Sequence, residues 1–141
     1  MKLELVSGQE NASVGTIFHN ILADNGYDEC NAPERNFMIF PERTIHHPKT
    51  LYNSIRKRVR DHIESDSDLF ILTYSDHVLN AVRVEVLHHK FEGAKVHQVT
   101  SEGIDVIANI ETSGAMSEWV SGIFDIWDDA LDELLLLKDI V

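Results

Sequence analysis

Short apolar runs and alternating positions along the chain predict strands. Leu69 to Leu72 is a run of four apolar residues that a sheet could bury on both faces. Phe37 to Phe40 predicts a second buried strand, which ends at Pro41 because proline cannot donate to a sheet ladder. Lys2 to Val6 alternates polar and apolar residues, as a half-buried strand does. These three stretches predict three strands of a sheet.

Apolar residues at helical spacing fill the intervals between these strands. Val14 to Ala23 carries an apolar face and ends at Asn25-Gly26, since glycine and asparagine readily adopt the left-handed closing conformation. Pro48 to Glu64 places apolar residues at intervals of four, which is typical of a helix packed on one side. Both stretches therefore predict helices that cover the sheet.

A third helix follows the apolar run 69–72. Either Ser75 or Asp76 can cap its first turn, because both side chains accept hydrogen bonds from backbone N–H groups. Its end is open: the alternation after residue 82 fits a new strand, and the helix could instead continue to His89. A buried strand that ends in polar residues at a helix start is where α/β proteins place ligand chemistry.

The remaining stretches complete an α/β domain. Residues 94–100 and 104–110 flank Ser101-Glu102-Gly103 and predict a β-hairpin. Residues 114–125 are irregular, and 128–137 predict an acidic amphipathic helix. Alternating strands and helices predict one domain over residues 1–141, with a mainly parallel sheet, flanking helices, and a C-terminal antiparallel hairpin and helix.

Charge divides the chain unevenly. The net charge of −12 argues against direct nucleic-acid binding, which lysine and arginine carry. Residues 118–141 hold seven acids and one lysine, whereas residues 49–60 hold five basic residues and no acid. The basic row is either a solvated helix face or a surface for an acidic partner, and its residues are Arg56, Lys57, Arg58 and Arg60. As surface charges, Arg56, Lys57 and Arg60 should be reversible to glutamate with little effect on folding.

Composition also sets the expected compartment. The one cysteine, Cys30, cannot form an internal disulfide and fits a reducing cytoplasm. No apolar stretch approaches the ~18 residues of a membrane span, and the first residues lack the pattern of a secretory signal. We expect a cytoplasmic protein with no membrane contact.

Four segments follow one another along the chain: ASVGTIFHNIL at residues 12–22, IFPERTIHHP at 39–48, TYSDHVLNAVR at 73–83 and WVSGIFD at 119–125. In this order they resemble the signature segment, the Walker B segment, the switch motif and a terminal "WPEGFFD" of RecF/SMC-like AAA ATPases. This group includes relatives of the overcoming-lysogenization-defect (OLD) proteins. The resemblance implies the carboxy-terminal half of a P-loop ATPase.

The family's catalytic positions are changed. His19, Phe40 and Tyr74 stand where the family has the signature serine, a Walker B acid and the switch histidine. Glu42 is the one catalytic carboxylate that a shifted frame could restore, if the chain is active. Under the resemblance, the nucleotide site survives only as remnants at Ser75, Asp76 and His77.

No Walker A motif, GxxxxGK[ST], occurs in the chain. The nearest segment is Gly8 to Thr16, in which Val14 would replace the lysine and Gly15 the metal-binding hydroxyl residue. The same segment also overlaps the signature reading, which we favour, and the sequence leaves the two open. The histidine doublets do not predict a metal site, because adjacent side chains point in different directions.

These changes predict a pseudo-ATPase rather than an enzyme. The first hypothesis is a non-catalytic interaction or regulatory protein, such as a phage or mobile-element decoy or regulator of a defence ATPase. Its partner would be a full-length ATPase or a second copy of itself, docked through the basic row and through Trp119 and Phe124, which should also pack onto the sheet. No cofactor is expected, except ATP and Mg²⁺ if a partner completes the site. The alternatives are an ATPase subunit whose Walker A comes from another chain, and an acidic DNA mimic.

Overall fold

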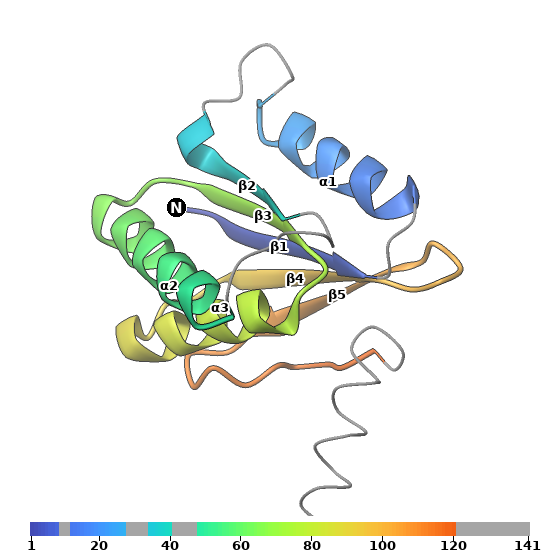
Figure 1. Cartoon of the computed structure of the whole chain (residues 1–141). Helices are drawn as coiled ribbons and strands as arrows, with labels where there is room; N and C mark the ends of the chain where they lie inside the picture. The colour runs from blue at the N-terminus through green and yellow to red at the C-terminus, as the bar shows by residue number, and fades with distance from the viewer. Residues whose placement is uncertain (9–11, 28–33, 41–47, 121–141) are drawn as a thin grey trace, which may run out of the picture.

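The elements alternate between strand and helix along most of the chain. A computed structural model describes residues 1–8, 12–27, 34–40 and 48–120. In chain order, the elements are β1 (Leu3–Gly8), α1 (Ala12–Asp24), the 3-10 turn η1 (Glu34–Asn36), β2 (Phe37–Phe40), α2 (Pro48–Ser65), β3 (Leu69–Thr73), α3 (Asp76–His89), β4 (Ala94–Val99) and β5 (Asp105–Ile110) (Figure 1). Glu42, Phe124 and the helix expected over 128–137 lie outside the described residues.

The five strands form one sheet in the order β2-β3-β1-β4-β5. The first four are parallel, and β5 pairs antiparallel with β4, which confirms the mainly parallel sheet with an added hairpin. β3 is buried over its whole length, as its apolar run predicted. The burial expected for β2 is wrong, because this strand lies at the sheet edge and Ile39 is 47% exposed.

Helices cover the two faces of the sheet unequally. α1 lies on one face, and α2 and α3 lie together on the other (Figure 1). The chain moves from β1 to the far edge at β2 and then returns, so right-handed crossovers require the first helix to lie opposite the next two. One core therefore gathers α2 and α3 against residues such as Leu5 and Ile71, and a second gathers α1 against Val6 and Phe70.

The ends of the helices follow local chemistry. Ser75, rather than Asp76, caps α3: its Oγ accepts a hydrogen bond from the backbone N–H of His77 at 3.2 Å. α3 then runs to His89, so the strand alternative for this stretch is wrong. The valines at 78, 82 and 86 recur every fourth residue and are all buried, so the apolar positions after residue 82 belong to the buried face of a helix and not to a strand. Gly26, at φ 85°, closes α1 as predicted.

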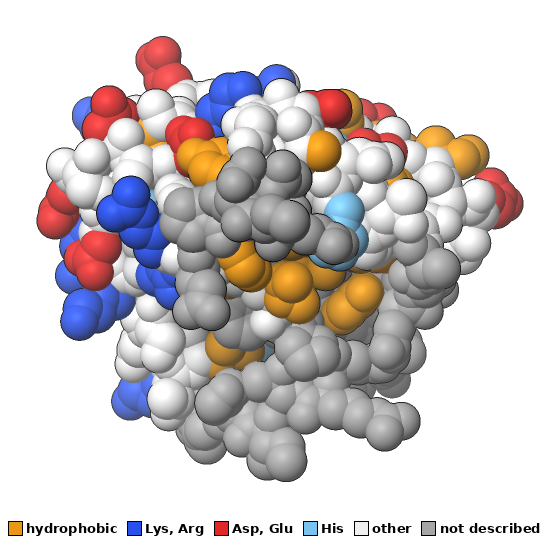
Figure 2. Space-filling model, turned by 90° about the horizontal axis from the view of Figure 1, so that it is seen from above, with side chains coloured by type: hydrophobic (Ala, Val, Ile, Leu, Met, Phe, Trp, Pro, Cys, Tyr) orange, Lys and Arg blue, Asp and Glu red, His pale blue; other side chains and the backbone are white. Residues whose placement is uncertain are grey.

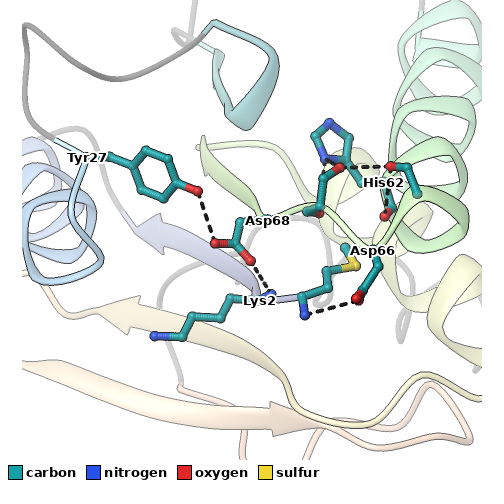
Figure 3. A network of polar contacts seen from close by, with 8 residues as sticks. Lys2, Tyr27, His62, Asp66 and Asp68 are labelled. Carbon is teal, nitrogen blue, oxygen red and sulfur yellow. Dashed lines mark hydrogen bonds and ion pairs between the residues drawn. The ribbon is translucent and has the colours of Figure 1, made fainter.

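Polar contacts fasten the amino edge of the sheet, where β1 and β3 begin (Figure 3). The Asp68 carboxylate accepts the backbone N–H of Lys2 at 2.8 Å and the hydroxyl of Tyr27 at 3.0 Å. The amino terminus pairs with Asp66 at 3.2 Å. His62 Nδ1 lies 3.0 Å from the Ser67 hydroxyl, in the turn between α2 and β3. These contacts position the starts of both strands, and their carboxyl ends lie at the opposite edge.

After β5 the chain returns alongside the same strand. Met116 forms a bridge with Ile110 and packs against the larger core, and the backbone N–H of Ser117 donates to Asn109 O at 2.9 Å. Residues 111–120 therefore extend the sheet region rather than leaving it. Among the described residues, no helix is long and apolar enough to cross a membrane.

Candidate functional site at the carboxyl edge of the sheet

The topology marks one place where an α/β domain would bind a ligand. β1 and β3 are neighbours, yet the connection after β1 leads to α1 on one face and that after β3 leads to α3 on the other. Such a divergence opens a crevice beyond the carboxyl ends of the two strands. The three predicted remnants of a nucleotide site, Ser75, Asp76 and His77, lie here at the start of α3.

A row of three buried polar side chains crosses the sheet at this edge. Ser7 pairs in register with Thr73 on one side and Gln98 on the other, and all three are at most 2% exposed. Their alternation along the strands places them on the face that carries α2 and α3. None of the three carries a charge, so the row supplies no cation for a phosphate.

Gln98 holds the returning chain against this edge. Its Nε2 donates to Glu118 O at 3.0 Å, and its Oε1 accepts the backbone N–H of Val120 at 3.1 Å. Thr73 Oγ1 is also used internally, because it accepts the backbone N–H of Ser75 at 3.0 Å. Two of the three polar side chains thus bond to the chain's own backbone.

Gly8 ends β1 in a position that only glycine fits. A Cβ at Gly8 would lie 2.7 Å from Val99 O and 3.1 Å from a methyl group of Val14. Val14, at the lysine position of a Walker A reading, is fully buried in the smaller core. The glycine therefore allows β4 and α1 to approach β1, and the lysine position is occupied by a packing residue.

Asp76 places a carboxylate in the first turn of α3. The positive end of the helix dipole favours an acid there, and the same acid repels a phosphate that would otherwise use this helix start. Asp76 Oδ2 and Ser7 Oγ are buried and have no hydrogen-bond partner among the described residues. Ser7, Thr73, Gln98 and Asp76 therefore offer no cation to a polyanion.

No protein family, curated protein or solved structure matches this chain. The resemblance to RecF/SMC-like ATPases rests on the four sequence segments. Of the residues that carry it, Ser75 and Asp76 lie at the start of α3, after the carboxyl end of β3, whereas Glu42 lies outside the described part of the chain.

The basic row of α2 is divided among different contacts. Arg56 Nε and Arg60 Nη2 lie 2.9 and 3.2 Å from the same oxygen of Glu85, which is 1% exposed on α3. His89 Nε2 lies 3.3 Å from its other oxygen. Burial raises the pKa of Glu85, but the hydrogen bonds from Arg60 and Arg56 outweigh it, and the pKa is lowered overall. Two of the four predicted docking residues therefore neutralise a buried carboxylate.

The other two residues of the row point to different surroundings. Arg58 Nη2 donates to Arg35 O at 2.8 Å, which ties α2 to η1, and Lys57 is exposed. Figure 2, seen from above, shows basic side chains at the left margin interspersed with acidic ones, and hydrophobic side chains near the centre. The contacts of Arg56 and Arg60 with Glu85 change the expectation that Arg56, Lys57 and Arg60 can be reversed with little effect on folding: we now expect a cost at Arg56.

Trp119 packs differently from the prediction. It is 50% exposed, and the Arg83 guanidinium of α3 lies 5.1 Å from the centre of its ring. Met116, rather than Trp119, anchors the returning segment in the core. Arg83, which in the sequence is only part of the switch-like segment, connects α3 to residues 111–120 because its Nε donates to Gly114 O at 2.7 Å.

A second group of titratable residues, also missed from the sequence, lies on the α1 face of the sheet. His97 Nδ1 lies 2.9 Å from Asp105 Oδ2, and His97 Nε2 lies 3.6 Å from Glu4 Oε1, beyond hydrogen-bond distance. Burial lowers the pKa of His97, but the carboxylates of Glu4 and Asp105 outweigh it, and the pKa is raised overall. Because the carboxylates face opposite nitrogens of one ring, the three side chains do not converge as metal ligands do. No group of three or more such residues does so in the described ranges.

Proposed function

We propose that this chain is a non-catalytic interaction domain, built like part of an ATPase and unable to hold a nucleotide by itself. The observation that carries the proposal is the burial of Val14, which occupies the lysine position if residues 8–16 are compared with a Walker A motif; if they are instead compared with the signature segment, no segment of the sequence corresponds to a Walker A motif. Phosphate-binding loops need a lysine and backbone amides that face the ligand. Here the corresponding side chain is fully buried in the core, and the glycine before the loop is used for packing.

The charge at the carboxyl edge supports the same proposal. A nucleoside triphosphate brings several negative charges, whereas the described side chains next to the start of α3 are Asp76 and the uncharged Ser7, Thr73 and Gln98. Gln98 also bonds to residues 118 and 120, so the returning chain lies where a ligand would compete with it. Such an edge suits a domain that has kept its architecture for binding a protein.

The resemblance suggests the kind of partner. A free-standing domain of this type would regulate a full-length ATPase or act as its decoy, for instance an ATPase that a phage or mobile element meets in its host. It would otherwise pair with a second copy of itself. The alternative of an ATPase subunit completed by another chain draws support from Ser7 Oγ and Asp76 Oδ2. Both atoms are buried and lack a partner within the described residues, so a group from a second chain could bond to them.

Turnover of Mg-ATP by the pure protein tests the proposal. We expect none above a blank purification, and no heat of binding when ATP or ADP is titrated calorimetrically. Glu42→Gln is the diagnostic variant, and Glu92→Gln, which changes an exposed acid after α3, is its matched control. Turnover that Glu42→Gln abolishes and Glu92→Gln preserves would overturn the proposal.

A further inference from the structure

An open groove of about 390 Å³ lies between α3 and the returning segment. Arg83, Val84 and Leu87 line it from the helix, and residues 113–115 form its opposite wall. The groove lies along α3, whereas the polar row lies at the carboxyl edge, and the proposed loss of catalysis does not depend on the groove. Arg83 and Trp119 belong to two of the segments that carry the ATPase resemblance, but the contacts that form the groove come from the structure alone.

Arg83 brings to this groove a charge that no acid of the described residues compensates. Its Nε donates to Gly114 O at 2.7 Å and its Nη1 to the Asn80 side-chain oxygen at 3.2 Å, and both acceptors are neutral. None of the ion pairs within the described ranges includes Arg83, in contrast to Arg56 and Arg60, which share Glu85. Burial lowers the pKa of Arg83, with no carboxylate acting against it. Three of the five N–H donors of a guanidinium remain for an acid.

Exposed apolar surface lies on both sides of the Arg83 guanidinium. Leu87 is 48% exposed one turn along α3, and Trp119 is 50% exposed with its ring 5.1 Å from the Arg83 guanidinium carbon. Arginine and tryptophan are the residues that most often carry binding energy at protein interfaces. An apolar groove beside a half-buried cation suits a ligand that has a carboxylate next to an apolar group.

The groove wall is fixed in place. Gly114 has φ 81°, and a Cβ there would lie 3.0 Å from Arg83 O and 3.5 Å from Leu87 Cβ, so glycine permits the close approach to α3. The bridge between Ile110 and Met116 holds the same segment to the sheet. A groove set by backbone contacts loses little conformational freedom on binding.

We infer that this groove binds a segment of a partner protein that presents one carboxylate beside an apolar side chain. The inference rests on the proposed function, and it identifies the groove as the surface that binds the partner protein. The net charge of −12 limits the partner, because a run of acids, or a nucleic acid, would be repelled by the rest of the molecule. One carboxylate satisfies Arg83, and the adjacent apolar side chain covers Val84 and Leu87.

Short synthetic peptides test the inference by NMR on the ¹⁵N-labelled full chain. The probes are acetyl-X-Asp-X-amide peptides, in which X is leucine, valine or phenylalanine, and the matched acetyl-X-Asn-X-amide peptides. We expect the Arg83 Nε–H and the Trp119 indole N–H to shift with an Asp peptide, and the Asn peptide to bind on the order of tenfold more weakly. Trp127→Phe separates the two indole signals.

Variants separate the two halves of the groove. Arg83→Gln should remove the preference for Asp over Asn, whereas Leu87→Ala should weaken both peptides and keep the preference. Lys57→Gln, which removes an exposed lysine on α2, is the control and should change neither. Thermal melts of each variant identify any loss of binding that comes from unfolding, and Leu87→Ala keeps the test valid if Arg83→Gln is unstable.

The salt dependence of peptide binding is an additional test. The affinity for the Asp peptide should stay the same or increase as NaCl rises from about 20 to about 200 mM, because salt screens the repulsion between the peptide and the acidic protein more than it screens a half-buried ion pair. Equal binding of Asp and Asn peptides, no shift with any peptide, or loss of affinity with salt would each overturn the inference. A wild-type dimer that Arg83→Gln dissociates would also overturn it, since a second copy would then fill the groove. These failures leave the proposed lack of ATP turnover untouched, and turnover dependent on Glu42 would remove the proposed function whatever the peptides do.

Discussion

Arg56→Gln should destabilise the fold, even though the sequence places Arg56 in a basic row typical of a solvent-exposed helix face. Its Nε donates to Glu85 Oε1 at 2.9 Å, and the Glu85 side chain is 1% exposed. The substitution removes one charged donor from a carboxylate that water does not reach. The carboxylate then depends on Arg60, whose side chain is 45% exposed, and on His89.

The magnitude follows from the burial of the acceptor. A hydrogen bond to a charged group contributes about 1.5–3 kcal/mol, and the two remaining partners of Glu85 place the expected loss near the lower end, at about 2 kcal/mol. For a domain of this length, about 3 °C of melting temperature corresponds to each kcal/mol, so the midpoint should fall by about 6 °C. Lys57→Gln, on the neighbouring exposed position, should change stability by less than about 0.5 kcal/mol.

Urea unfolding as a function of pH is the discriminating assay. The folded-state pKa of Glu85 is lowered from its usual 4.5, so its stabilising contribution is present above that range and is lost as the pH falls through the folded pKa. In Arg56→Gln, burial has less opposing charge and Glu85 takes up a proton at higher pH. The difference between wild type and variant should therefore be full at neutral pH and shrink on acidification.

A double-mutant cycle with Glu85→Gln separates the pair from the rest of the network. The coupling between positions 56 and 85 should be about 1–2 kcal/mol. Equal stability of Arg56→Gln and Lys57→Gln would refute the reasoning, and so would a wild-type advantage that stays constant down to acid pH. Either result would mean that groups other than Arg56 balance the buried charge of Glu85.

Three further predictions concern the sheet and its edge. The raised pKa of His97 means that its contribution is full below about pH 6.5 and is lost as the pH rises through the folded value, so wild-type stability should fall more than that of His97→Gln between about pH 6 and pH 9 in urea unfolding. Gly8→Ala should cost about 1–3 kcal/mol by overpacking against Val99 O, whereas Gly15→Ala, with no atom within 4 Å of the new Cβ, should be neutral or stabilising in thermal melts. Ser75→Ala should cost about 1 kcal/mol through loss of the cap on α3, and Ser75→Asp should restore most of it.

The sequence predicted the elements because their signals are local. The buried run at 69–72, the spacing of Ile55 and Val59, and the turn at 101–103 each depend on a few neighbouring residues, and the structure has a strand, a helix and a hairpin there. The error at β2 has a different origin. An apolar run of four residues is the same in a central and an edge strand, and only the strand order decides which it is.

The side-chain partners were less predictable because they depend on distant residues. Arg56 and Glu85 are 29 residues apart, and Arg83 and Gly114 are 31 apart. A basic row without acids nearby in the sequence looks solvated, although its counter-charge lies on the next helix. One signal was available: Glu85 falls among apolar residues of a helical face, where a buried acid needs a cation.

The Walker A interpretation of Gly8 to Thr16 makes one demand on the backbone and another on the side chains. A Walker A segment must follow a strand and open a helix, and this segment does lead from the central strand β1 into α1. Its side chains do not fit, because Val14 is buried and the Cβ position of Gly8 is taken by Val99 O. The order of the strands sets the path of the backbone, and this path is kept when a residue is replaced by another that still packs in the core. Phosphate binding instead needs a particular cation. A chain with this backbone and without that cation is what we expect of a domain that binds a protein, and Arg83, a half-buried cation with no ion pair among the described residues, is the place to look for the binding surface.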